Sequence, residues 1–258
     1  MSGVTHLLNL YTVDTNVPRP ESYRQDYNLT LQMDPVDAQQ TYSEIASAAE
    51  SGWDFSSRWF ADKAHMETIR IRSIIPVDLN SILFAVEGFL SEAARLVGDT
   101  ARSSYFNEQV SQTTIDLLFI LFSYSTMLPL QKEARRVAIK ALLWNETSSH
   151  WADFNVLTGE HTQGFYVSNF VPIWAGALAD EQQEESARTR MFEAFLPQLD
   201  FECGVPTSDY AKPSDVPEQW DFPNSWPPLQ EMTVTILEKL DLSQCRHIID
   251  DLKLMHII

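Results

Sequence analysis

The hydrophobic pattern of this chain follows the helical repeat almost throughout, and no other feature constrains its fold as strongly. Over residues 34–49 the apolar positions fall on one face of a helix. Asp34 is a favourable N-cap, Pro35 suits the first helical position, and Gly52 is placed to end the helix. Runs with the alternating pattern and hairpin turns of β-strands are sparse. The sequence therefore predicts an all-α fold.

A second strong helical pattern runs from Ile82 to Val97. Its broad apolar stripe predicts a helix that Asp78 or Asn80 caps and that Gly98 ends. Residues 1–33 lack such a pattern, and we expect them to be irregular or extended. Further helices are predicted at about 100–110, 132–143, 166–179, 181–196 and 228–241.

The segment Glu50–Phe60, ESGWDFSSRWF, gathers tryptophan and phenylalanine side chains around Asp54 and Arg58. Apolar sugar faces stack on indole rings, and sugar hydroxyls bind carboxylates and guanidinium groups, so this composition suits a carbohydrate. The apolar walls would also favour the protonated form of Asp54, which a proton donor near neutral pH requires. For an isolated Trp-Asp pair, a buried aspartate that caps a turn is the more common explanation.

Two further clusters have a related composition. In PRPESY (Pro18–Tyr23), two prolines stiffen a loop that carries Arg19 and Glu21, a pair that in isolation is usually a surface ion pair. In QWDFPNSWPPLQ (Gln219–Gln230), two tryptophans and an aspartate lie among prolines that prevent a helix until positions 227–228. Alone, this stretch could be an interaction loop. Together, the three clusters favour a shared carbohydrate pocket.

The composition argues against some classes of partner. A chain of 258 residues can form one large domain with its own core. The formal charge of −18 argues against nucleic acid, because phosphate binding needs clustered lysine and arginine. Cys203 and Cys245 have no metal-ligand spacing, and free thiols or one bridge are equally compatible with their number. No signal peptide is visible, and we expect no cofactor and no metal.

The clusters resemble segments of the trehalases of glycoside hydrolase family 37. PRPESY, ESGWDFSSRW, PVDLNS and QWDFPNSWPP occur in the family's order, and LLWNE (Leu142–Glu146) followed by Trp151-Ala-Asp153 is also similar. The resemblance covers about residues 5–110 and 132–235. It implies an (α/α)6 barrel, incomplete in this chain, and inverting hydrolysis of α,α-trehalose to two glucose molecules. Family members are secreted, membrane-attached or cytoplasmic, so the resemblance does not indicate a compartment.

The resemblance also implies roles for individual residues. Asp54 matches the family's general acid. Four residues match positions that contact the sugar: Arg19, Pro20, Glu21 and Gly52. Trp220 and Trp226 belong to a signature that helps to enclose it.

The chain departs from the family pattern in several places. Three segments of the family have no counterpart in this chain: a glycine-rich signature, an R-S-Q segment with an asparagine, and the glycine-rich stretch that carries the general-base glutamate. In addition, Ser225 stands where the family has Gly, Ala or Val. We therefore expect a partial catalytic domain that is inactive alone. A non-catalytic sugar-binding relative and an all-α protein-interaction module are the alternatives.

The segment Ser111–Gln131 has no equivalent in the family as the resemblance defines it. Its unbroken apolar run, Leu117–Phe122, belongs to a stretch shorter than the roughly 20 residues of a comfortable membrane span. Neither a buried core helix nor a membrane helix fits the segment well, so we interpret it as a retained intron, with a genuine insertion as the alternative. We treat 111–131 as an anomalous insertion and expect the end of the chain, about 241–258, to be atypical.

Overall fold

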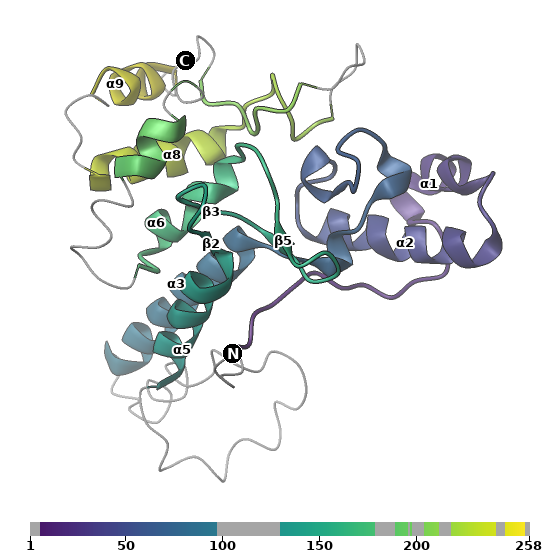
Figure 1. Ribbon diagram of the computed structural model, residues 1–258, viewed down its shortest axis with the longest axis horizontal. Coiled ribbons are helices and arrows are strands. Elements are labelled where there is room, and N and C mark those ends of the chain that lie inside the picture. The colour runs from purple at the N-terminus through teal and green to yellow at the C-terminus, as the bar shows by residue number, and fades with distance from the viewer. Residues whose placement is uncertain are drawn as a thin grey trace. The chain divides into compact units, whose positions relative to one another are not determined.

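The computed structural model describes residues 6–96, 130–178, 189–195, 197, 204–211, 218–240 and 246–255 (Figure 1). Several predicted features lie outside these ranges. They are the helix at 100–110, Gly98 as the end of the preceding helix, most of the 111–131 segment, and both cysteines. The chain divides into two compact units. The first comprises Met1–Asn9, Pro76–Ala152 and Ser168–Met191, and the second comprises Leu10–Ile75, Asp153–Val167 and Phe192–Ile258.

In the second unit, the predicted helix at 34–49 is confirmed as α2 (Pro35–Glu50). The Asp34 carboxylate accepts hydrogen bonds from the amide nitrogens of Val36 and Asp37 at 2.9 and 3.1 Å, as an N-cap should. On the inner face Tyr42 and Ile45 are buried, which fixes the orientation of the helix. Local sequence signals thus specified this element from cap to end.

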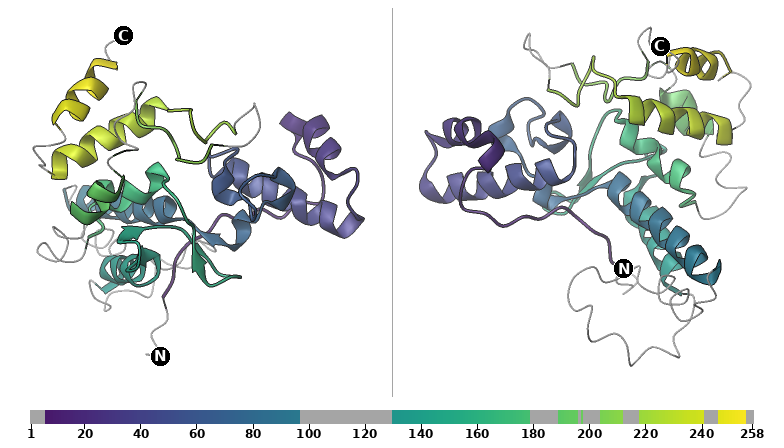
Figure 2. Two further views of the ribbon diagram at one scale, coloured as in Figure 1. Left: turned by 45° about the horizontal axis from the view of Figure 1, so that its top comes forward. Right: turned by 180° about the vertical axis from the view of Figure 1, so that it is seen from behind.

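The prediction that residues 1–33 are irregular is wrong for their last third. A short 3-10 helix, Pro20–Ser22, leads into α1 (Tyr23–Thr30), which lies beside α2 in both views of Figure 2. The inner face of α1 is polar: Asp26 and Thr30 are buried, and the Thr30 hydroxyl lies 2.7 Å from the Tyr42 hydroxyl. Its two tyrosines are exposed. A hydrophobicity pattern cannot detect a helix that buries its polar residues.

After α2, the chain forms a series of short turns that lead to the strand Ile74–Ile75. Three 3-10 helices cover Ser57–Trp59, Met66–Thr68 and Ile71–Ser73. A three-stranded antiparallel sheet follows in the order β1-β4-β5, with pairs no longer than two residues. Its strands are β1 (Ile74–Ile75), β4 (Phe154–Asn155) and β5 (Glu160–His161).

The C-terminal helices of the second unit are α8 (Pro227–Leu240) and α9 (Arg246–Met255), which pack against each other. The start of α8 confirms the prediction that prolines 227–228 open a helix. Ile248 and Leu252 of α9 are buried.

In the first unit, α3 (Val77–Leu96) packs against α6 (Val171–Ala175) and α5 (Leu130–Ala138). The expected cap at Asp78 or Asn80 is wrong, because α3 already begins at Val77 and both residues lie inside its first turns. Asn80 instead accepts a hydrogen bond from the buried guanidinium of Arg135 at 3.0 Å. Tertiary contacts, not a local cap, determine its orientation.

The remaining elements of this unit are short. A π-helical turn, Ile139–Leu143, continues α5 and confirms the helix predicted at 132–143. A hairpin of β2 (Trp144–Asn145) and β3 (His150–Trp151) follows. The helix predicted at 166–179 is present only as the 3-10 helix Val167–Phe170 and α6, which ends at Gly176, with φ of +69°. Of the helix predicted at 181–196, residues 189–195 are helical.

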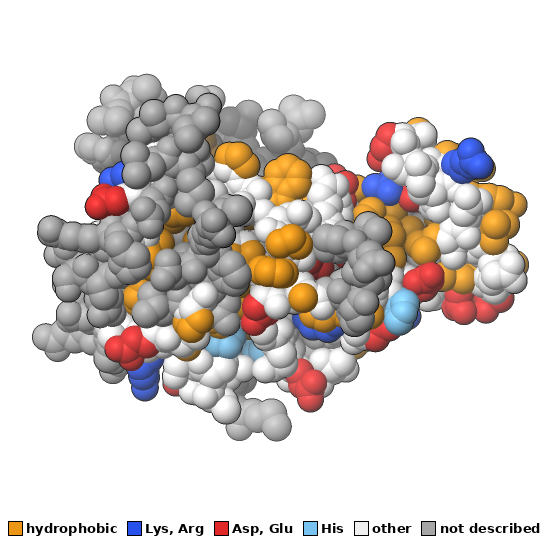
Figure 3. Space-filling view, turned by 90° about the horizontal axis from the view of Figure 1, so that it is seen from above, with side chains coloured by type: hydrophobic (Ala, Val, Ile, Leu, Met, Phe, Trp, Pro, Cys, Tyr) orange, Lys and Arg blue, Asp and Glu red, His pale blue; other side chains and the backbone are white. Residues whose placement is uncertain are grey.

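The described residues are mostly helical, and their strands are two residues long, so the all-α prediction is confirmed. Acidic side chains are scattered over the face seen in Figure 3, consistent with the formal charge of −18. Among the helices described, none has both the length and the apolar character needed to cross a membrane.

Candidate active site

The candidate active site begins where α2 ends. Gly52 has a φ of +75°, a left-handed value that glycine adopts without steric cost, and the chain leaves the helix there. Asp54 follows in an irregular loop and is half-buried, while its neighbour Trp53 is only 7% exposed. The expectation that Asp54 lies just beyond a helix C-terminus is therefore confirmed. Residues 52–57 are called the Asp54 loop below.

Arg19 is held beside this loop. Its guanidinium donates two hydrogen bonds of 2.9 Å to the buried carboxylate of Asp26 and lies 5.2 Å from the ring centroid of Phe55. The hydrogen bond with Asp26 raises the pKa of Arg19, and the negative charges of Glu21 and Asp54 act in the same direction. A simple surface pair of Arg19 with Glu21 is thus the wrong interpretation, because the hydrogen-bonded partner is the buried Asp26.

Three indole rings form an aromatic cluster next to the loop. Trp220 stacks on Trp53 with a centroid distance of 5.3 Å and on Trp226 with a distance of 4.6 Å. The backbone amide of Trp220 also donates a 3.0 Å hydrogen bond to the carbonyl of Phe55. The Trp226 indole donates to the carbonyl of Gln219 at 3.2 Å. The cluster therefore joins two segments that lie far apart in the sequence.

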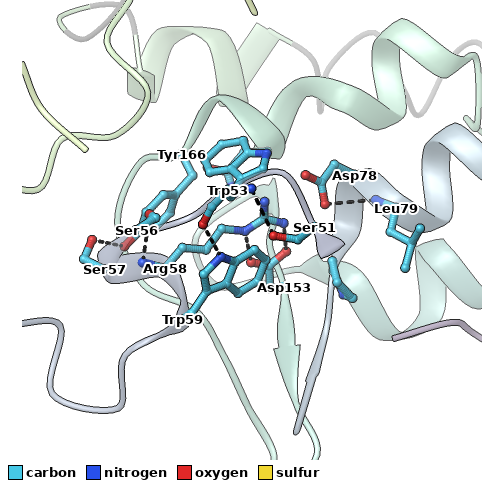
Figure 4. Close-up of polar contacts among 12 residues, drawn as sticks. Ser51, Trp53, Ser56, Ser57, Arg58, Trp59, Asp78, Leu79, Asp153 and Tyr166 are labelled. Carbon is cyan, nitrogen blue, oxygen red and sulfur yellow. Dashed lines mark hydrogen bonds and ion pairs between the residues drawn. The ribbon is translucent and has the colours of Figure 1, made fainter. Parts of the chain in front are cut away.

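Arg58, which the sequence suggested as one of the groups that could bind a sugar, is buried in an ion pair. Its side chain is fully buried and donates two hydrogen bonds to Asp153, at 2.6 and 2.7 Å. The guanidinium carbon lies 4.6 Å from the ring centroid of Trp53 and 4.2 Å from that of Trp59 (Figure 4). The Arg58 guanidinium is therefore paired within the core, against the rings of Trp53 and Trp59.

Asp221 is a second buried carboxylate, and sequence reasoning assigned it no role. One of its oxygens accepts hydrogen bonds from the hydroxyls of Ser56, Ser57 and Ser208, at 3.0, 2.9 and 2.9 Å. The other accepts from the backbone amide of Ser57 at 2.7 Å. Burial raises the pKa of Asp221, and the hydrogen bonds oppose that shift. The repeated Trp-Asp pair was the one sequence signal that could have pointed to this residue.

Lys63 extends this polar network. Its ammonium group donates a 3.0 Å hydrogen bond to the Tyr166 hydroxyl, which lies 3.0 Å from the Ser57 hydroxyl. Burial lowers the pKa of Lys63 to about 8 and raises that of Tyr166. Within the described ranges, no group of three or more His, Cys, Asp or Glu side chains could hold a metal ion.

Comparison with known proteins assigns the chain to a family. The sequence model of the Trehalase family matches residues 1–250. The chain belongs to the trehalase family. The trehalase of Dictyostelium discoideum is 34% identical over 233 residues, which cover 89% of this chain and 35% of that protein. Human trehalase is 30% identical over 251 residues, covering 96% of this chain and 38% of that protein. The chain thus spans little more than a third of the length of these relatives.

Solved structures agree on the fold. Neutral trehalase of Saccharomyces cerevisiae superimposes with a TM-score of 0.64 at 17% identity, covering 90% of this chain and 42% of that one. A GH63 mannosylglycerate hydrolase of Thermus thermophilus, solved with glucose, gives a TM-score of 0.50 at 13% identity, covering 92% of this chain and 49% of that one. The expected fold class, an all-α hydrolase fold of the (α/α)6 type, is therefore supported for this trehalase family member.

In this member of the trehalase family, every site residue suggested by the resemblance lies in the second unit. The Asp54 charge is one of those that raise the pKa of Arg19, and Trp220 and Trp226 share one aromatic cluster. Glu21 is exposed but adds to the charge around Arg19. The other two shape the backbone: Pro20 is the first residue of a 3-10 helix, and Gly52 ends α2.

Proposed function

We propose that the protein is a glycosidase that hydrolyses α,α-trehalose to two glucose molecules with inversion, and that Asp54 is its general acid. Family membership supports the substrate and the reaction. One geometric observation carries the residue assignment: the residues on either side of Asp54 contact other proposed site residues. Trp53 stacks on Trp220, and Phe55 lies under the Arg19 guanidinium.

The chemistry of the reaction explains why these neighbours matter. Asp54 would donate its proton to the glycosidic oxygen as the bond to the anomeric carbon breaks, so that one glucose leaves as a neutral alcohol. Water would add to the anomeric carbon from the opposite face and lose its proton to a second carboxylate, roughly 6.5–9.5 Å from the first. Indole rings would stack on the apolar sugar faces, and Arg19, Glu21 and the backbone near Pro20 and Gly52 would bind hydroxyls.

The decisive experiment replaces the proposed proton donor. In the full-length protein, Asp54→Asn should still bind trehalose but lose turnover by about 10²- to 10⁴-fold, because an amide cannot protonate the leaving oxygen. Asp37→Asn is a matched control: Asp37 is an exposed carboxylate at the opposite end of α2. Activity of Asp54→Asn above half of the wild-type rate would exclude the acid role. Trehalose binding without turnover in the wild-type protein would indicate a non-catalytic relative.

We further propose that residues 1–258 by themselves do not release glucose. No glutamate in the sequence lies in a motif like that of the family's general base, and an inverting hydrolase needs both carboxylates. The test is a glucose-release assay on the purified 258-residue chain, with its Asp54→Asn variant as background. A wild-type signal clearly above that background would mean that another carboxylate of this chain acts as the base.

A further inference from the structure

The Trp220-Asp221 pair contacts both residues of the chain next to Asp54. On the N-terminal side, the ring of Trp53 stacks on Trp220. On the C-terminal side, the carbonyl of Phe55 accepts a hydrogen bond from the Trp220 amide at 3.0 Å. One residue of the second Trp-Asp pair thus holds the two neighbours of Asp54.

Asp221 extends this contact to the next two residues. Its carboxylate accepts the hydroxyl hydrogen bond of Ser56 and both the hydroxyl and the amide hydrogen bonds of Ser57. All three residues are completely buried, so water cannot substitute for a lost partner. The fourth hydrogen bond, from Ser208, fixes Asp221 to a separate segment of the same unit. The carboxylate therefore ties the Asp54 loop to a buried framework.

We propose that Asp221 is a positioning residue, whose carboxylate holds the Asp54 loop so that the Asp54 carboxyl group meets the glycosidic oxygen of the substrate. This inference rests on the proposed function, in which Asp54 is the general acid. Asp221 is buried behind the loop and contacts the serines, so it acts through them and not on the sugar. Efficient proton transfer requires hydrogen-bond distance to the leaving oxygen, and a displacement of about 1 Å can lower a rate about 10²-fold.

The variant that isolates this role is Asp221→Asn. Asparagine has the same shape but replaces one carboxylate oxygen with an NH2 group. If that group takes the place of the oxygen bound to the Ser57 amide, two donors face each other; if it takes the other place, three hydroxyls lose their common acceptor. Either way the loop loses part of its attachment, while the volume of the core stays the same.

Two substrates distinguish positioning of the acid from general damage. Trehalose needs a proton on its leaving oxygen, whereas α-glucosyl fluoride releases fluoride, which departs without that help as water adds to the anomeric carbon. In the full-length protein, we expect Asp221→Asn to lower kcat for trehalose by roughly 10-fold or more, and kcat for the fluoride by much less. A purely structural defect would lower both rates by the same factor.

A milder variant and a control complete the experiment. Ser56→Ala removes the hydrogen bond that the Ser56 hydroxyl donates to Asp221 and the one that it accepts from the Arg58 amide. It leaves the Asp221 carboxylate in place and should shift the trehalose-to-fluoride rate ratio in the same direction, by a smaller factor. Ser47→Ala removes two hydrogen bonds of an equally buried serine on α2, with Ser43 and Val13, and should leave the ratio unchanged. If Asp221→Asn does not fold, Ser56→Ala decides the matter.

The same measurement on Asp54→Asn separates this inference from the proposed function. If Asp54→Asn lowers both rates equally, or neither, the general-acid assignment fails. If Asp54→Asn is selectively slow on trehalose but Asp221→Asn and Ser56→Ala keep the wild-type ratio, Asp54 is the acid and the positioning role of Asp221 is overturned.

Discussion

The buried ion pair between Arg58 and Asp153 should make a large contribution to stability. Neither side chain is more than 2% exposed, and two hydrogen bonds of 2.6 and 2.7 Å join them. Asp153→Asn keeps the volume but leaves the Arg58 charge without its counter-charge in the core. Removing one partner of a buried pair typically costs about 3–5 kcal/mol. This is a large fraction of the roughly 5–15 kcal/mol by which a domain is usually stable.

An exposed pair in the same unit provides the control. Lys253 and Glu238 are also 2.6 Å apart, but each is 51% exposed. Because water screens such a pair, Glu238→Gln should lower the free energy of unfolding by at most about 1 kcal/mol. Both ion pairs have an N–O distance of 2.6 Å, so the two variants show how the cost of breaking a pair depends on its burial.

Urea-induced unfolding followed by tryptophan fluorescence would measure both effects, since Arg58 lies against the rings of Trp53 and Trp59. A third variant, Arg58→Met combined with Asp153→Leu, removes both charges and should recover much of the loss. If Asp153→Asn and Glu238→Gln cost the same, or if the double variant is the least stable of the three, the reasoning from burial is refuted.

Two further predictions concern a buried lysine and a constrained glycine. Because the folded-state pKa of Lys63, about 8, lies below its usual 10.5, the folded protein binds fewer protons than the unfolded one between these values. The wild type should therefore gain stability relative to Lys63→Met as pH rises from 8 to 10.5, and a constant difference in urea unfolding would contradict this. Gly204→Ala should lower the midpoint of thermal unfolding clearly more than Gly159→Ala, although both glycines have positive φ, +91° and +73°. A Cβ on Gly204 would lie 2.8 Å from the side chain of Gln230, which is buried and hydrogen-bonded to the backbone of Val205. A Cβ on Gly159 would meet no atom within 4 Å. Equal shifts of the two melting midpoints would contradict this steric argument.

The resemblance to a family is enough to suggest Asp54 as the general acid, whereas only the fold shows which residues surround it. The sequence pointed to the Trp-Asp pairs as parts of one site, and the contacts of Trp220 with Trp53 support that grouping. The sequence could not reveal that the second pair holds the first through Ser57 and Asp221, because the hydrogen bond joins residues 164 positions apart.

What the sequence determined by itself was local. The N-cap at Asp34, the glycine at the end of α2 and the prolines at the start of α8 each act within a few residues, so the chain specifies them without reference to its fold. The all-α class follows from the same short-range periodicity.

Only the tertiary structure decided which charged groups serve as internal supports. Arg58 could have faced a ligand, but it is buried against Asp153, 95 residues away in the sequence. Arg19 pairs with Asp26, which is buried on a helix whose exposed face carries the tyrosines. A charge enters the core only where a partner compensates for its lost hydration, and for Arg58 that partner comes from a distant segment that packs against it. Arg19 and Asp26 are only seven residues apart, but Asp26 is buried on α1, and α1 packs against α2.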